Sequence, residues 1–371
     1  MAMAMRPRSS TLLLIVAVLA PACAEIKQAT PTGDAGRVTS PSGEIDADGG
    51  GLPPTDSNGT TATVEDLLTG RNRPGARSTS GFRAWRSGLA VHDDRLYWVE
   101  SGTAPGLYSA PTSCTSNDCV EQLAAFTRPS AFTATATALY TSDTTVIKRL
   151  AFSAGAKVEQ VATAPDEVVN LASDGQNVFW TSGTKQEIWR TPSSGTTGAI
   201  IYSNGTPVAM GIAGDRVYWA GVDISGQLGA LQSIRTNGKE AREVSRFSNG
   251  FHVMSGNDKY LYYAKDEPAA IHRVTLATGR DEVVANEALG VTDIAVDDTH
   301  AYWVEPGDGS DISNGEVRRV AHDSKEPETL AVSIPYPVAI AVSGKNVYVA
   351  TGGTKAKSYA DGKLLKLTLG N

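Results

Sequence analysis

Acidic side chains recur in the segments that separate the predicted strands of this chain. Exposed carboxylates in loops can attract a cation or a basic protein surface, and loops often carry function. The alternative is the ordinary solvated surface of an acidic protein. Together with two nearby arginines, these acids form a candidate binding face that consists of Asp223, Asp266, Glu267, Glu305, Asp308, Asp311, Arg86 and Arg128.

Motifs of known catalytic chemistry do not stand out in the sequence. It contains no Gly-rich phosphate loop, no G-x-S-x-G turn and no H-E-x-x-H helix. Segment 308–314 offers oxygen ligands but does not match a cation loop. The five histidines lack metal-ligand spacing, and His92 and His300, in equivalent turns, are expected to be solvated. We therefore assign no catalytic residue, no metal site and no cofactor.

Two of the three cysteines are close together in sequence. Cys114 and Cys119 flank a Thr-Ser-Asn-Asp loop. In an exported chain this spacing predicts a local disulfide, and without further ligands the pair would be a poor metal site. Closing so short a loop would stabilise the fold by about 2 kcal/mol.

The N-terminal residues have the organisation of an export signal. Arg6 and Arg8 precede an apolar run at 11–20, which is too short for a stable transmembrane span. Residues 1–22 are thus predicted to be a signal peptide. The small residues before Cys23 resemble the bacterial lipobox, in which the cysteine is acylated. Ordinary cleavage at Ala20-Pro21-Ala22, with Cys23 incidental, is the alternative.

Residues 23–60 are expected to form the acylated cysteine and a disordered tether. Gly, Pro, Ser, Thr and Asp dominate this segment, and apolar periodicity is absent from its sequence. In a lipoprotein, Ala24 rather than Asp after the cysteine implies the outer membrane. The membrane would then be reached through the lipid anchor only.

A sequence repeat occupies residues 61–371 and is clearest at 293–305, where two short apolar runs flank four turn-forming residues. Its first aromatic position recurs every 39 to 46 residues. A period near 40 residues built from strands is typical of a propeller with four strands per blade. The seven copies, and hence seven blades, are marked by Tyr97, Tyr140, Phe179, Tyr218, Tyr262, Tyr302 and Tyr348.

Each copy also has an internal pattern. A large apolar residue generally stands eight positions before the aromatic, as Ile294 does before Tyr302, and in the fourth copy we assign Ile212, six positions before Tyr218. Many copies then carry two adjacent aromatics, such as Tyr302-Trp303. Successive side chains of a strand point to opposite faces, so both are buried only in a sheet covered on both sides. We therefore expect the tryptophans to be core residues.

The N-terminal strand of the domain is predicted to close the ring. Segment 63–68 (Val-Glu-Asp-Leu after Thr63) matches the fourth strands of other copies, such as Val158-Glu-Gln-Val. The final copy lacks a fourth strand of its own. Pairing the two would leave no open edge in that blade.

The Ile-Ala-Val-Asp and Tyr-Trp motifs of this sequence repeat resemble the YWTD repeat of receptor-type propellers and, more loosely, NHL and TolB-like repeats. The dipeptide after Tyr-Trp is Val-Glu or Ala-Gly here rather than Thr-Asp. The resemblance implies a bacterial envelope lipoprotein with an all-β, seven-bladed propeller domain. Its implication for function is weaker, because one fold hosts many functions.

These observations favour a non-enzymatic binding or scaffold propeller that is tethered in the cell envelope. It would recognise a protein or glycan through the loop-rich mouth of its channel and act as a monomer. A net charge of −7 gives no basic footprint for nucleic acid. The alternative is a propeller hydrolase or lyase of the lactonase or streptogramin-lyase kind, which would hold a metal at the same mouth.

Overall fold

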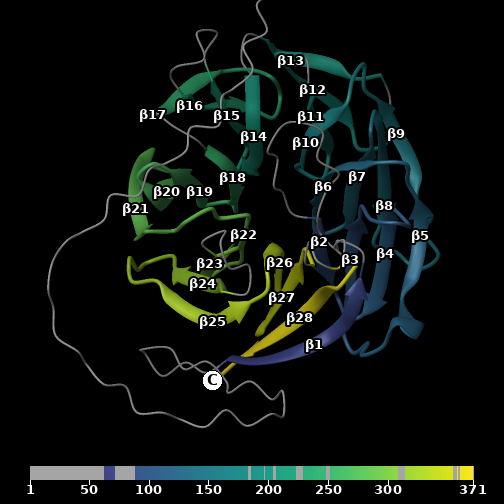
Figure 1. Cartoon of the computed structure of the whole chain (residues 1–371). Coiled ribbons are helices and arrows are strands. Elements are labelled where there is room, and N and C mark those ends of the chain that lie inside the picture. The colour runs from purple at the N-terminus through teal and green to yellow at the C-terminus, as the bar shows by residue number, and fades with distance from the viewer. Residues whose placement is uncertain are drawn as a thin grey trace, which may run out of the picture. The chain divides into compact units, whose positions relative to one another are not determined.

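Seven antiparallel sheets of four strands make up the structured part of the chain. They are arranged around a common centre (Figure 1). The computed structural model describes residues 62–71, 88–182, 185–195, 197–203, 206–222, 229–247, 251–307, 314–353, 357 and 360–370. The predicted signal peptide, the tether and Cys23 lie outside these residues.

Six sheets, here called blades 1 to 6, use consecutive strands. They are β2 (Leu89–His92), β3 (Arg95–Glu100), β4 (Gly106–Pro111) and β5 (Glu121–Ala125); β6 (Pro129–Ala134), β7 (Ala138–Asp143), β8 (Val146–Ala151) and β9 (Glu159–Thr163); β10 (Val168–Ser173), β11 (Asn177–Ser182), β12 (Glu187–Pro192) and β13 (Ala199–Ser203); β14 (Thr206–Ala213), β15 (Arg216–Val222), β16 (Gly229–Arg235) and β17 (Arg242–Phe247); β18 (Phe251–Gly256), β19 (Tyr260–Asp266), β20 (Ala269–Thr275) and β21 (Arg280–Asn286); and β22 (Asp293–Val296), β23 (His300–Glu305), β24 (Gly315–Ala321) and β25 (Glu328–Ile334).

The first strand of each blade lies innermost. Each of these strands contacts the first strand of the next blade, from β2 through β6, β10, β14, β18 and β22 to β26 (Pro337–Ser343). The strand β26 in turn contacts β2, so the circle is closed. The seven-bladed β-propeller predicted from the repeat is therefore confirmed.

Blade 7 joins the two ends of the described chain. It consists of β26, β27 (Asn346–Thr351), β28 (Gly362–Leu369) and, outermost, β1 (Ala62–Arg71). The strand β1 runs antiparallel to β28, with Ala62 opposite Leu369 and Glu65 opposite Lys366. Figure 1 shows β1 beside β28, at the opposite ends of the colour scale. The predicted closure by segment 63–68 is confirmed.

The aromatic pairs form the core between blades. Trp98, Trp180, Trp219 and Trp303 are each at most 1% exposed. Both members of the pair are buried in most blades because a neighbouring blade covers each face of the sheet. The prediction that these tryptophans pack in the core is confirmed.

The structure corrects one assignment in the fourth copy of the repeat. Met210 lies opposite Trp219, as Ile294 lies opposite Trp303. Met210, not Ile212, therefore holds the large apolar position, eight residues before Tyr218. The next residue is Gly211, where an added Cβ would lie 2.9 Å from Cγ of Met254 in the next blade. Close packing of the innermost strands requires the small residue there.

Candidate functional site

The expected binding face is only partly covered by the described residues. Arg86, Asp223, Asp308 and Asp311 lie outside them. The turn between β19 and β20 exposes Asp266 and Glu267, as expected. The other two members, Glu305 and Arg128, are engaged within the fold.

Glu305 is buried, with 8% of its surface exposed. Its Oε1 accepts hydrogen bonds from Nε1 of Trp303 at 2.8 Å and from Nη1 of Arg318 at 3.2 Å. Its Oε2 accepts from the backbone N–H of Leu289 at 3.0 Å. The expectation of an exposed carboxylate is therefore wrong for this residue. Glu305 lies two positions after Trp303 on the same strand face, which places the two side chains side by side.

Arg128 joins the segments that enter blades 2 and 3. Its guanidinium forms an ion pair with Glu167. One carboxylate oxygen of Asp143 accepts from the backbone N–H groups of Thr127 and Arg128 at 2.9 and 2.8 Å. This arginine therefore has a structural role in addition to any contact with a ligand. The described members of the candidate face belong to three separate blades: 2, 5 and 6.

Two of the histidines that we expected in solvent are packed against aromatic rings. His92 stacks on Phe152 with ring centroids 4.2 Å apart, and both residues are half-buried. His300 contacts Tyr302 at 5.8 Å, and burial lowers the pKa of His300 below its ordinary value. Both histidines are half-buried and therefore less solvated than predicted. Across the described ranges, no group of three or more His, Cys, Asp and Glu residues could hold a metal ion.

A groove between blades 1 and 2 is a hollow that the sequence did not predict. It consists of two adjoining depressions of about 550 and 370 Å³, which share Glu121, Leu123, Leu150 and Ala156 in their walls. The strand β5 forms one wall, and β9 with the turn before it forms the other. Both strands are outermost in their sheets.

The floor of this blade 1–2 groove is apolar. Leu150 is buried, and Leu123, Phe152, Ala156 and Val158 are partly buried against the cluster that joins the two blades. At one end, Tyr97 lies 5.0 Å from Phe152, ring centroid to centroid. Tyr97 is half-buried, whereas Trp98, the next residue in the aromatic pair, is fully buried. Burial raises the pKa of the Tyr97 hydroxyl above its ordinary value, and Arg95 opposes that rise.

The rims of the groove carry charges of both signs. Arg95 donates to Oγ of Ser109 at 2.6 Å and lies 3.4 Å from a carboxylate oxygen of Glu121. Lys148 lies over the ring of Phe126, at 4.4 Å, and 3.6 Å from Asp143. An apolar floor with mixed polar rims can bury a ligand and also orient it. The sequence did not predict the groove, although Leu123 and Val158 are apolar residues directly beside a Glu-Gln pair, in or next to an outermost strand.

A second polar cluster lies in blade 5. Asp281 accepts hydrogen bonds from the hydroxyl of Tyr263 at 2.6 Å and forms another with Nδ1 of His272 at 3.1 Å. Burial would raise the pKa of Asp281, but the hydrogen bonds from His272 and Tyr263 hold it below its ordinary value. The carboxylate is therefore ionised and fixes the His272 ring.

Comparison with known proteins adds the fold class but not a family. No protein family matches the sequence, and no curated protein is significantly similar to it. A chain of the mitotic checkpoint complex aligns over 91% of this chain and 98% of its own, at 12% identity and a TM-score of 0.57. The WD40 domain of Pan2 from Neurospora crassa aligns over 82% and 95%, at 8% identity and 0.57. A TolB structure from Agrobacterium tumefaciens aligns over 57% and 84%, at 14% and 0.45. The first two of these likenesses support the β-propeller fold.

Proposed function

We propose that this protein is a non-enzymatic binding or scaffold propeller that takes up an extended segment of a protein partner in the blade 1–2 groove. The observation that carries the proposal is the groove itself, with an apolar floor between two outermost strands. A propeller is consistent with this role because it presents a rigid surface built from many strands.

An extended polypeptide fits the shape of this groove. Four consecutive residues of one wall, 121–124, and five of the other, 156–160, face the hollow. Outermost strands present backbone groups that a further strand can pair with, and side chains of that strand can enter adjacent pockets. Leu123, Leu150 and Val158 offer the apolar contacts. The mixed charges of the rims then favour one orientation of the segment.

Among the described residues, the groove offers more to a ligand than the channel mouth does. At the mouth, Glu305 is buried against Trp303, and Arg128 is paired with Glu167. Exposed charges steer a partner but contribute little to affinity, whereas a desolvated apolar centre dominates it.

Placement in the cell envelope is the second part of the proposal. Export by the signal at 1–22 and acylation at Cys23 would hold the propeller at the outer membrane, with segment 24–60 as spacer. A monomer would suffice, because the groove lies within one chain. In the described portion, no helix combines the length and the apolar character needed to cross a membrane.

Photocrosslinking in intact cells tests the groove. A crosslinking amino acid at Gln160, on the rim, is expected to give a discrete adduct that protease removes. The matched control is Glu243 of β17. Gln160 lies opposite Lys148 and Glu243 opposite Gln232, so the two occupy the same register position in different blades. The control should give no such adduct.

Three results would count against this assignment. An adduct from Asp308 with none from Gln160 would move binding to the channel mouth. An adduct that resists protease but yields to a glycosidase would make the partner a glycan. Equal adducts at Gln160 and Glu243 would show that the groove has no selectivity.

A further inference from the structure

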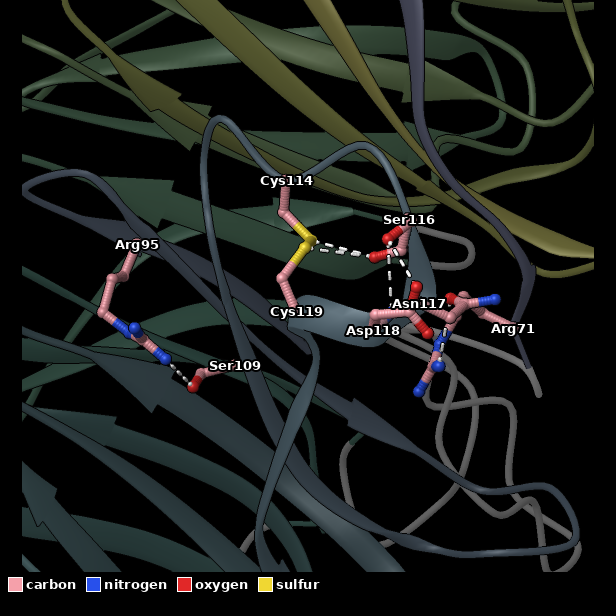
Figure 2. Close-up of a disulfide and its surroundings, with 8 residues drawn as sticks. All are labelled: Arg71, Arg95, Ser109, Cys114, Ser116, Asn117, Asp118 and Cys119. Atoms are coloured by element: carbon pink, nitrogen blue, oxygen red, sulfur yellow. Dashed lines mark hydrogen bonds between the residues drawn. A yellow bond between two sulfur atoms is a disulfide. The ribbon is translucent and has the colours of Figure 1, made fainter.

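The closing strand β1 is held by blade 1 as well as by its own sheet. The side-chain amide of Asn117 donates to the backbone carbonyl of Thr69 at 3.1 Å. Nη1 of Arg71 donates to Oδ1 of Asn117 at 3.3 Å. Asn117 belongs to the loop between β4 and β5 of blade 1, so a single side chain binds two positions of β1. Figure 2 shows Asn117 between the disulfide and Arg71.

The Cys114–Cys119 disulfide determines the shape of that loop. It spans the one-turn helix η1 (Asn117–Cys119), whose first turn is capped by Ser116, with Oγ accepting from the N–H of Asp118 at 3.3 Å. Both ends of the short turn that presents Asn117 are therefore fixed. The predicted disulfide is present. The loop that it closes belongs to blade 1, but this loop also contacts β1, a strand of the last blade.

The two sulfur atoms lie in different surroundings. Cys114 is 4% exposed and belongs to the same apolar cluster as Leu67 and Leu68 of β1. Cys119, in contrast, is exposed. A thiolate from solvent can therefore reach the sulfur of Cys119, while the other sulfur is packed against the closing strand.

A second contact between β1 and blade 1 does not involve the loop. Nη2 of Arg71 lies 2.6 Å from Oε1 of Glu100, which is 1% exposed, and the guanidinium lies 5.7 Å from the centre of the Trp98 ring. Loss of the disulfide would leave this ion pair in place. Reduction is thus expected to loosen β1 without releasing it.

We propose that the Cys114–Cys119 disulfide is a redox-sensitive clasp, by which we mean that the oxidised loop of blade 1 holds the closing strand β1 in the propeller ring. A thiolate of a dithiol reductant attacks Sγ of Cys119, and the S–S bond breaks with Cys114 leaving as a thiolate. The second thiol of the reductant then displaces Cys119 from the mixed disulfide. Two electrons and two protons pass from the dithiol to the cystine, which ends as two thiols. The freed loop no longer holds Asn117 against Thr69, and β1 opens more often.

Hydrogen exchange on the folded full chain, before and after treatment with dithiothreitol, tests the clasp. Reduction is expected to speed exchange of the β1 amides by about tenfold, as local opening becomes easier. Exchange in β21, the outermost strand of blade 5, should not change. Mass spectrometry after alkylation confirms that both cysteines are reduced.

Two variants separate the clasp from general destabilisation. Asn117→Ala, with the disulfide intact, should also speed exchange in β1, whereas Thr115→Ala, an exposed change in the same loop, should not. Unchanged β1 protection after complete reduction would overturn the proposal. Equal acceleration in β1 and β21 would overturn it as well, because the disulfide would then support the whole fold. Neither readout depends on the binding function proposed above.

Discussion

At the scale of single residues, the most informative pairing is a tryptophan with a glutamate two positions later. Trp98 donates to Glu100, and Trp303 donates to Glu305, each at 2.8 Å between Nε1 and Oε1. An arginine neutralises each buried carboxylate, as Arg318 does for Glu305. A buried charge is tolerated only when it is paired and hydrogen-bonded. These acids therefore maintain the blades and do not form an exposed acidic patch.

Replacing Trp303 with alanine tests this role. The substitution leaves a cavity in a fully buried site and leaves Glu305 without one donor, so the free energy of unfolding should fall by about 3–5 kcal/mol. Denaturant unfolding measures the loss. Trp303→Phe fills most of the space but lacks the indole N–H, and should cost less. An alanine variant as stable as the phenylalanine variant would contradict the packing argument.

At the scale of strands and blades, charged residues also join one blade to the next. Glu282 of β21 lies 2.7 Å from a guanidinium nitrogen of Arg273 and 2.8 Å from Nζ of Lys325, which belongs to blade 6. Hydrogen bonds from Lys325 and Arg273 lower the pKa of Glu282 to about 2, from an ordinary value of 4.5. We therefore expect acid to weaken the contact between blades 5 and 6.

Stability is predicted to fall below pH 4.5 for this reason. Because the folded-state pKa of Glu282 is depressed, its contribution is fully present above about 4.5 and is lost as the pH falls toward 2. Glu282→Gln should be less stable near neutral pH, by on the order of 1–3 kcal/mol, and should decline less steeply on acidification. Melting temperatures measured from pH 7 to pH 2 check this. Parallel curves for the two proteins would rule out Glu282 as a titrating group.

Strand β1 gives the second prediction at this scale. Deleting residues 61–68 removes the outermost strand of blade 7 and exposes the edge of β28, so aggregation is expected. Deleting residues 24–58 removes only the segment that we predict to be a tether, so stability should be nearly unchanged. Light scattering and thermal melting compare the two deletions. Equal aggregation and equal melting temperatures of the two deletion variants would contradict the assignment of β1 as the closing strand and of 24–58 as a tether.

At the scale of the whole molecule, closure links the two ends of the described chain. Asp66 of β1 and Lys363 of β28 are 2.7 Å apart between Oδ2 and Nζ, although 297 positions separate them in sequence. Contacts between such distant residues form late, because the entropy of closing the intervening chain must first be offset. The disulfide-closed loop of blade 1 contacts the same strand, through the hydrogen bond from Asn117 to Thr69.

The proposed anchor belongs to this scale too. Cys23→Ala removes the acylation site and should move the protein from the membrane fraction to the soluble fraction of the envelope. Cell fractionation followed by immunodetection measures the distribution. Cys119→Ala serves as a control, because it removes a different cysteine and should leave the protein in the membrane fraction. A membrane fraction that is unchanged in Cys23→Ala would refute the lipid anchor.

The sequence alone determined the fold, the number of blades, the closing strand and the disulfide. Strand formation follows from local alternation and turn residues, and a period near 40 residues requires the strands to be grouped in fours. Such information lies within each repeat, so it can be read without knowing how repeats pack. The error at Ile212 arose because Met210 and Ile212 are both apolar and lie two positions apart on the same strand, so the sequence alone did not show which of them faces Trp219.

Only the tertiary structure decided which residues are accessible and which meet. The sequence predicted that Glu305 is an exposed acidic residue of a loop. In the structure its carboxylate is buried and accepts hydrogen bonds from Trp303 and Arg318. The blade 1–2 groove exists because two outermost strands from different repeats leave their apolar side chains partly uncovered. Asn117 meets Thr69 because the ring brings the first and last blades together. These features arise between repeats, where packing rather than local pattern decides the contact.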